Sequence, residues 1–273
     1  MTLNCNGKIL DFSSKKIMGI LNISKDSFFD GGKYDTIDKG ISQVSKLISN
    51  GAEIIDLGAA TSKPGSKLIN PVEELNLTHD IIIELTKNFK NIIFSIDTYN
   101  SSVADFALSK GFSIVNDISS GRYDKNMYNV VKNYNAGYIL MHMLGDPSNM
   151  QLNPKYDNVT ETIIKFFKIK IDELENLGFT NIIIDPGFGF GKTLEDNYTI
   201  LRELNTLKSL KKPIMVGLSR KSMIYKALNI SPKEALNGTT ILNTLAFDKG
   251  ANILRVHDVK EALECKNLVD RLS

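Results

Sequence analysis

Cysteines, arginines and long apolar runs are all scarce in this chain. The scarcity of cysteines and of apolar runs argues against two classes of protein. Its 273 residues include two cysteines, Cys5 and Cys265, near opposite ends and without a C-x-x-C pair, so we expect free thiols rather than a disulfide framework. No run reaches the roughly 18 apolar residues of a membrane span. Residues 1–16 lack the apolar core of a signal peptide. We therefore expect a cytoplasmic protein without a membrane partner.

A concentrated charge and an internal linker are also missing. The formal net charge is +2 with both signs interspersed, which argues against a surface dedicated to nucleic acid. No Pro/Gly/Ser-rich stretch divides the chain. Its length is close to the roughly 250 residues of a (β/α)8 barrel, a fold that forms one domain despite its size. We therefore predict a single domain over residues 1–273.

The chain does contain eight apolar, strand-like runs, each with a polar group at or just past its end. They are KIMGILN to Asn22, EIIDLG before Thr61-Ser62-Lys63, IIFSID to Asp97, SIVND to Asn116-Asp117, YILMH to His142, IIIDPG with Asp185, PIMVGLSRK with Ser219-Arg220-Lys221, and NILRVHD with Arg255-Val256-His257. Their alternation with helical patterns indicates βαβ units and a parallel sheet. An open, doubly wound sheet would give the same alternation, but eight units with polar ends favour a closed (β/α)8 TIM barrel, whose chemistry lies at the strand ends.

Helical patterns fill the gaps between these runs. Ile37, Ile41, Val44 and Ile48 recur at helical spacing before Gly51, and Asn70-Pro71 has the residues of a helix start. Further helices are predicted at residues 101–110, 124–134, 157–177, 195–209, 232–248 and 258–271. Two long polar segments, 24–34 and 59–70, interrupt the rhythm after the first two strands, and we interpret them as functional loops beside the pocket.

Three polar residues at strand ends are suited to recognising a heterocycle. Asp97, Asn116 and Asp185 end different strands, so a barrel brings them to one mouth. A carboxylate accepts two parallel N–H groups, which the 2-amino-4-oxo edge of a pterin or guanine offers, and an asparagine adds a donor and an acceptor. The alternative is that each one only caps the helix after it.

Arg255 and His257 alternate along the last strand and therefore face the same side. A basic pair before a helix start predicts an anion site. The alternative is that Arg255 pairs with a core carboxylate and His257 bonds to the backbone. Only five arginines are present, so a retained one hints at a need for its planar fork.

Two glycine-containing segments resemble known motifs but fail them. The run from Asp185 to Thr193 is not a P-loop because Pro186 stands where glycine is required, and Lys192 breaks a G-x-G-x-x-G match. We interpret it as a flexible glycine loop that bears Phe190. Gly217-Leu218-Ser219 begins like a nucleophile elbow, but Lys221 occupies the last glycine position, so a serine hydrolase is not expected.

A magnesium site is suggested by two hard oxygen ligands. Asn22 and Asp30 lie at and after the end of the first strand. Mg²⁺ typically takes one or two protein ligands together with substrate phosphate oxygens. We therefore expect Mg²⁺ as the cofactor, bound beside the predicted anion site.

Taken together, these segments resemble the dihydropteroate synthase family, pterin-binding barrels of folate biosynthesis. The resemblance runs from about Ile17 to Asp270, through MGILNISKDSFFDGG, GAEIIDLGAATSKPGS, SIDTYNSSVA, IVNDISSG, ILMHMLGDPSNMQ, IIIDPGFGFGKT, VGLSRKSMI and ILRVHDVKEA. It implies a transferase that condenses p-aminobenzoate with 6-hydroxymethyl-7,8-dihydropterin diphosphate and releases pyrophosphate. It also implies a homodimer and a sulfonamide target.

The resemblance also implies roles for individual residues. It assigns the pterin to Asp97, Asn116, Asp185 and Lys221, Mg²⁺ and pyrophosphate to Asn22 and Asp30, pyrophosphate to Arg255 and His257, and p-aminobenzoate to Ser62, Pro64, Phe190, Lys221 and Ser222, with Phe28 and Ser219 nearby. A pterin-barrel methyltransferase would share the Asp/Asn set without needing Arg255 and His257. A non-catalytic relative would be expected to have lost Lys221, Arg255 or Asn22.

The chain departs from the family pattern in two loops. Residues 58–65 read GAATSKPG where the family has G-G-E-S-T-R-P-G, so Lys63 replaces an arginine fork with a point charge. Ser24-Lys25 stands where the family has Thr-Pro. We expect these differences to affect the contacts around p-aminobenzoate and the response to sulfonamides more than the activity.

Overall fold

Eight parallel strands form the centre of the molecule. The computed structural model describes residues 1–23, 32–59, 65–66 and 68–272. Within them the strands are β3 (Lys16–Asn22), β4 (Ile54–Gly58), β5 (Ile93–Asp97), β6 (Ile114–Asp117), β7 (Gly137–Met141), β8 (Ile182–Asp185), β9 (Met215–Val216) and β10 (Ile253–Val256). They pair in the order β8-β7-β6-β5-β4-β3-β10-β9. A bridge between Ile184 and Ile214 joins the two edge strands. The predicted (β/α)8 TIM barrel is confirmed.

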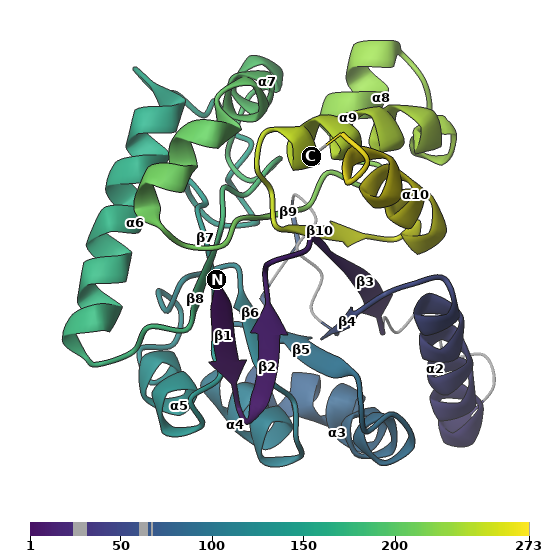
Figure 1. Cartoon of the computed structure of the whole chain (residues 1–273). Coiled ribbons are helices and arrows are strands. Elements are labelled where there is room, and N and C mark those ends of the chain that lie inside the picture. The colour runs from purple at the N-terminus through teal and green to yellow at the C-terminus, as the bar shows by residue number, and fades with distance from the viewer. Residues whose placement is uncertain (24–31, 60–64, 67, 273) are drawn as a thin grey trace.

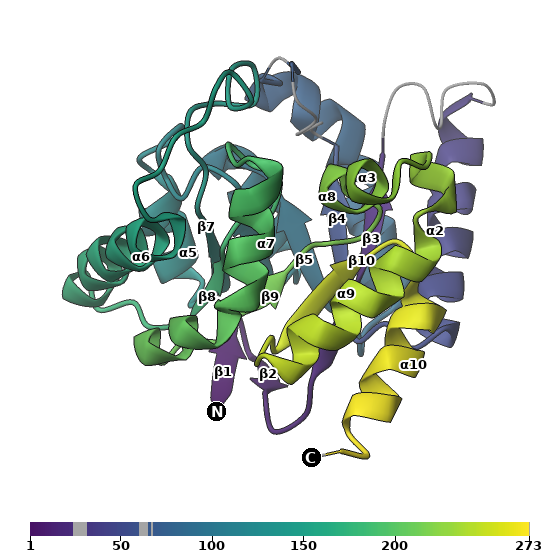
Figure 2. The same ribbon diagram turned by 90° about the horizontal axis from the view of Figure 1, so that it is seen from above.

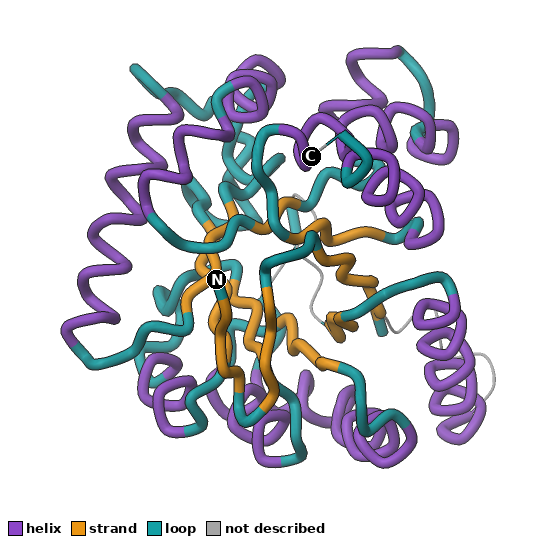
Figure 3. Tube along the Cα trace, viewed as in Figure 1, coloured by secondary structure: helices purple, strands orange, loops and turns teal. Residues whose placement is uncertain are grey.

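Helices surround the strands on the outside (Figures 1 and 3). They are α2 (Gly32–Ser49), α3 (Pro71–Asn88), α4 (Ser101–Ser109), α5 (Met127–Asn133), α6 (Val159–Asn176), α7 (Leu194–Arg202), α8 (Ser222–Leu228), α9 (Leu236–Asp248) and α10 (Val259–Val269). The predicted start of α3 is confirmed, because the Asn70 side chain accepts the backbone N–H of Glu73 at 2.9 Å. Among the described residues no helix is long and apolar enough to cross a bilayer.

The helix boundaries differ from prediction around α7 and α8. The helix expected at 195–209 ends at Arg202, and a 3₁₀ helix, η2 (Leu204–Leu210), follows. Its buried residues Leu204, Leu207 and Leu210 are three apart, which is the repeat of a 3₁₀ helix. Helix α8 was not predicted. It has seven residues and ends at Asn229, whose left-handed conformation (φ 53°) stops the helix.

The side chains that point into the barrel form two layers. One layer is apolar, and the other, nearer the carboxyl ends of the strands, is polar. Seven strands each contribute one residue to a single buried cluster: Met18, Ile54, Ile114, Ile139, Ile183, Met215 and Ile253. Side chains two residues further along a strand face the same side. Asp56 therefore follows Ile54, Asn116 follows Ile114, Asp185 follows Ile183, and Arg255 follows Ile253 towards the carboxyl end.

An N-terminal hairpin closes the opposite end of the barrel (Figure 2). Strands β1 (Thr2–Cys5) and β2 (Lys8–Asp11) pair antiparallel. Leu3, Cys5 and Leu10 are buried in the same cluster as the interior strand residues. The hairpin was not predicted, although Asn6-Gly7 carries the signal: both residues have positive φ, as a type I′ turn requires. The hairpin thus fills the amino end of the barrel interior, and the polar side chains lie towards the carboxyl ends of the strands.

Candidate active site

The carboxyl ends of the strands enclose a small cavity of about 70 Å³. Seven of the residues predicted from sequence line it: Asp97, Asn116, Asp185, Phe190, Lys221, Arg255 and His257. Ile20, Ile118, Met141, Gly217 and Ser219 complete the lining. The parallel topology thus gathers side chains from positions 97 to 257 around one space, as the strand-end pattern predicted.

A buried network links the inner polar level of the barrel. Asp56 Oδ2 accepts Arg255 Nε at 2.6 Å and Asn116 Nδ2 at 3.0 Å. Arg255 Nη2 donates to Asp97 Oδ2 at 2.6 Å. The observed pairing is therefore the alternative in which Arg255 bonds to core carboxylates, and pyrophosphate binding by Arg255 stays a prediction. The guanidinium still lines the cavity, with a fifth of its side chain exposed.

Asp56 is a site residue that the sequence reasoning missed. It is fully buried, and its Oδ1 has no hydrogen-bond partner among the described residues. The sequence did contain a sign of its role, because Asp56 is the only charged residue in the otherwise apolar strand IIDLG. A carboxylate in such a strand requires a compensating cation, and Arg255 supplies it from across the interior.

Burial and mutual charge shift the acidity of this network. Burial raises the pKa of Asp97 to about 7, with Arg255 opposing the shift and Asp56 adding to it. Burial works against the charge of Arg255, but Asp56 and Asp97 outweigh it, so the pKa of Arg255 lies above its ordinary value. One cation therefore holds two carboxylates together, which fixes the position of Asp97 and Asn116 at the cavity wall.

Asp185 and Lys221 form the opposite side of the cavity. Asp185 Oδ1 accepts the backbone N–H of Gly187 at 2.8 Å, and Lys221 Nζ donates to the carbonyl of Phe188. Burial raises the pKa of Asp185 while Lys221 opposes that rise. Burial lowers the pKa of Lys221 to about 8, with Asp185 opposing. A carboxylate acceptor and an ammonium donor thus face the same space.

The loop that bears Phe190, which we predict to be flexible, makes many side-chain contacts. Lys192 is 2% exposed and bonds to the carbonyls of His142, Gly187 and Phe190 at 2.9–3.1 Å. Burial lowers the pKa of Lys192 to about 7, and burial together with the Lys192 charge lowers that of His142 to about 3. The sequence reasoning named Lys192 without giving it a role, because its burial depends on the tertiary fold.

His257 and Arg220 differ in their relation to the cavity. His257 is on the rim, where its Nδ1 lies 3.1 Å from Ser219 Oγ. Desolvation and the charge of Arg255 lower the pKa of His257. Arg220 pairs with both oxygens of Asp258 at 2.9 and 3.0 Å. The guanidinium of Arg220 therefore links the residue before α10 to the segment between β9 and α8.

Two predicted residues lie outside the lining of this cavity. Asn22 ends β3 at the barrel mouth, paired in register with Gly58, which in turn pairs with Asp97. Ser222 is the first residue of α8. The predicted residues Asp30, Ser62 and Pro64, and the neighbouring Phe28, lie outside the described residues.

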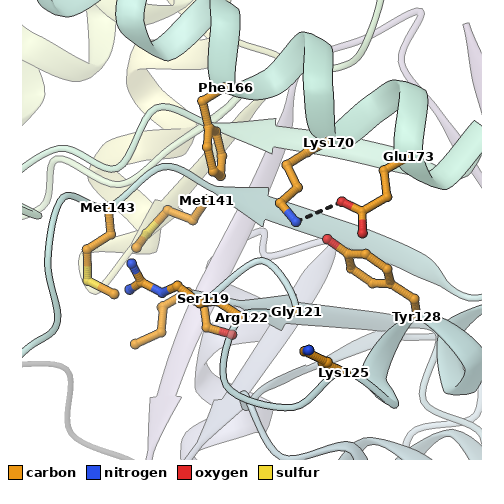
Figure 4. A pocket seen from close by; sticks show the side chains of 11 residues that line it. Ser119, Gly121, Arg122, Lys125, Tyr128, Met141, Met143, Phe166, Lys170 and Glu173 are labelled. Carbon is orange, nitrogen blue, oxygen red and sulfur yellow. Dashed lines mark hydrogen bonds and ion pairs between the residues drawn. The ribbon is translucent and has the colours of Figure 1, made fainter.

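A second hollow lies beside the first, between the end of β6, α5 and α6 (Figure 4). Met141, Met143 and Phe166 give it an apolar wall, and Lys170 pairs there with Glu173 at 2.8 Å. It shares Ile118 and Met141 with the cavity at the barrel mouth. The predicted site residues that the structure describes are all absent from its lining.

Comparison with known proteins places this geometry in a family. A family model described as pterin binding enzyme matches residues 18–257. The chain is 36% identical to the dihydropteroate synthase of Escherichia coli K12 over 272 residues, 99% of this chain and 96% of that protein. It is 39% identical to the dihydropteroate synthase of Clostridium beijerinckii over 257 residues, 93% of each.

Solved structures give the same result. The Yersinia pestis dihydropteroate synthase with a sulfonamide drug complex superposes with a TM-score of 0.92 at 35% identity, covering 100% of this chain and 98% of that one. The Xanthomonas albilineans enzyme in complex with 7,8-dihydropteroate has a TM-score of 0.89 at 30% identity, with the same coverage.

Proposed function

Because this chain belongs to the pterin binding enzyme family, with dihydropteroate synthases as its relatives over nearly its whole length, we propose how its barrel mouth carries out their reaction. The chain is an enzyme of folate biosynthesis, a transferase that condenses p-aminobenzoate with 6-hydroxymethyl-7,8-dihydropterin diphosphate and releases pyrophosphate. The observation that carries the proposal is the convergence of Asp97, Asn116, Asp185 and Lys221 on one cavity.

The pterin ring is held between the two polar sides of the cavity. Asp185 accepts the paired N–H groups of the 2-amino-4-oxo edge, and Lys221 donates to a ring acceptor beside it. Asn116 and Asp97 bind the opposite edge, held in place by Asp56 and Arg255. Because these side chains are fixed before the ligand arrives, little reorganisation is needed on binding.

The leaving group is stabilised at the β10 side of the mouth. Arg255 and His257 face the same side of the chain and lie on the cavity wall. Negative charge grows on pyrophosphate as its bond to the methylene carbon breaks, so donors aimed at it bind the transition state more tightly than the substrate. The amine of p-aminobenzoate then attacks the electron-poor methylene carbon from the side of Phe190, Lys221, Ser222, Ser62 and Pro64, and the new C–N bond is completed as the amine nitrogen releases a proton.

Mg²⁺ is proposed as the cofactor, held by Asn22 and Asp30 together with phosphate oxygens. Asn22 fits this role: its side chain is exposed at the mouth, and its Oδ1 and Asp97 Oδ2 both approach the same face of Gly58. A hard oxygen donor next to the carboxylate end of the network suits Mg²⁺, which takes few protein ligands. When bound, the ion would neutralise charge on pyrophosphate.

Other properties of the family are proposed for this chain as well. We infer a cytoplasmic enzyme that forms one domain over residues 1–273, assembles as a homodimer and is a sulfonamide target. Exposed apolar residues on late helices support the dimer: Leu228 on α8, and Ile241 and Leu245 on α9. Burial of such residues between two copies would remove apolar surface from water.

The proposed function is tested by mixing the purified protein with pterin diphosphate, p-aminobenzoate and Mg²⁺ and measuring dihydropteroate and pyrophosphate. One pyrophosphate is expected for each dihydropteroate formed. Titration calorimetry with each substrate alone and with the other present would then show whether p-aminobenzoate binding needs the filled pterin site. Pterin binding without product would indicate a non-catalytic relative, and transfer of a methyl group from methyltetrahydrofolate would indicate a methyltransferase.

A further inference from the structure

Lys192 is a buried ammonium whose contacts all lie on one loop and the strand end beneath it. Its Nζ lies 2.9 Å from the carbonyl of Gly187, 3.0 Å from that of Phe190 and 3.1 Å from that of His142. In its protonated form the amine has three N–H groups, one for each of these acceptors. Nδ1 of His142 lies at 3.1 Å as well. Lys192 therefore joins both ends of the segment 187–190 to the end of β7.

The loop also packs closely against backbone. A Cβ on Gly187 would lie 2.1 Å from the carbonyl oxygen of His142, and one on Gly191 would lie 2.4 Å from that of Leu144. Both glycines have positive φ, 70° and 63°. The glycines serve close approach of two backbones, and this approach brings the carbonyls within reach of Lys192.

Two side chains from the segment between β7 and α6 tie down the outer edge of the same loop. Gln151 Nε2 donates to the carbonyl of Gly189 at 2.6 Å, and the Tyr156 hydroxyl donates to that of Gly191 at 2.7 Å. Together with Lys192, and with Lys221 at the carbonyl of Phe188, four side-chain donors thus bond to carbonyls along residues 187–191. Buried carbonyls rarely stay without partners, so loss of these donors would let the loop change its path.

The residue whose position depends on this arrangement is Phe190. Its ring lines the cavity, with its centroid 4.8 Å from Lys221 Nζ. The backbone of Asp185 belongs to β8 and is held by strand pairing with Met141, and one of its carboxylate oxygens, Oδ1, also accepts the N–H of Gly187 in the loop. We propose that Lys192, supported by Tyr156 and Gln151, is a positioning residue that sets Phe190 as the wall of the p-aminobenzoate side while leaving pterin recognition largely unchanged. This inference rests on the proposed function, which supplies the two substrates.

The test compares steady-state kinetics of the wild type with Lys192→Met, which keeps the length of the side chain and removes its donors. We expect KM for p-aminobenzoate to rise about tenfold or more, the cost of losing bonds to a charged donor, and the dissociation constant of the pterin diphosphate to change by less than about threefold. Lys168→Met, on the exposed face of α6, is the matched control and should leave both values unchanged.

A double-mutant cycle with Phe190→Leu separates positioning from general damage. If Lys192 acts through Phe190, adding Lys192→Met to Phe190→Leu should raise KM for p-aminobenzoate little further, because the wall is already lost. Independent, multiplying effects would overturn the inference, and so would equal losses for both substrates. If Lys192→Met does not fold, Tyr156→Phe replaces it, with an expected rise of about threefold in the same KM; an unchanged KM would overturn the inference. A wild type that forms no dihydropteroate would refute the proposed function instead.

Discussion

Arg255 and Asp56 are 199 positions apart in the chain, yet they form a 2.6 Å ion pair in the interior of the barrel. The pair places the guanidinium between Asp56 and Asp97, so one side chain serves both the core and the cavity. A substitution at Arg255 therefore has two effects. It removes a cation beside the leaving group, and it leaves two buried carboxylates without their ionic partner. The first prediction separates them.

Arg255→Ala should lower the free energy of unfolding by about 3 kcal/mol, because two buried carboxylates lose their cation. It should also weaken binding of the pterin diphosphate much more than binding of plain hydroxymethylpterin. Adding Asp56→Asn should restore most of the stability without restoring diphosphate binding. Urea denaturation and titration calorimetry measure the two effects. Recovery of diphosphate affinity in the double variant would mean that Arg255 acts only through the core.

Asp185→Asn should weaken pterin binding by about 1–3 kcal/mol, because it replaces a charged acceptor with an amide that presents a mismatched donor to the ring. Calorimetry with hydroxymethylpterin gives the affinity directly. Asp172→Asn, on the exposed surface of α6, removes the same charge away from the cavity and should have no effect. Unchanged affinity in Asp185→Asn would exclude Asp185 from pterin recognition.

Glu74, at the start of α3, makes stability depend on pH. Its carboxyl is buried, with Oε2 bonded to Thr98 and Asn100 and Oε1 without a partner among the described residues. Burial raises its pKa to about 7 from 4.5. The unfolded state therefore releases this proton at lower pH than the folded state. Its stabilising contribution is complete below pH 4.5 and is lost as the pH rises to about 7.

Glu74→Gln cannot ionise, so its stability relative to the wild type should be about 2–3 kcal/mol better at pH 8 than at pH 5. The fixed cost of a buried amide cancels in this difference. Urea denaturation at the two pH values provides the measurement, and Glu264→Gln, an exposed carboxyl on α10, is the control. The same difference at both pH values would mean that Glu74 ionises normally.

Ile241→Lys with Leu245→Lys should convert the proposed homodimer to a monomer. These residues lie one turn apart on α9, with 51% and 41% of their surface exposed, so two lysines would place charge on one apolar face. Sedimentation velocity measures the mass. Ile169→Lys, on α6 and 66% exposed, should leave the dimer intact. A wild type that sediments as a monomer would contradict the proposal.

The sequence by itself determined the barrel and most of its mouth. Asp97, Asn116, Asp185, Lys221 and His257 could be predicted because parallel strands present their carboxyl ends on one face. That inference requires only the pattern of strands and their order along the chain, and the amino-acid sequence contains both. The turn residues Asn6-Gly7 also indicated a hairpin, but the sequence did not show that this hairpin covers the end of the barrel.

Only the tertiary structure decided which groups pair inside the barrel. Asp56 meets Arg255 because strands β4 and β10 both border β3, which brings together residues from the two ends of the chain. Lys192 is buried because glycines let its loop lie against the end of β7. Asp56 is paired with an arginine far away in sequence, and Lys192 bonds to the distant carbonyl of His142 as well as to two carbonyls of its own loop. Local pattern therefore predicts where a polar residue stands, and packing decides what it bonds to.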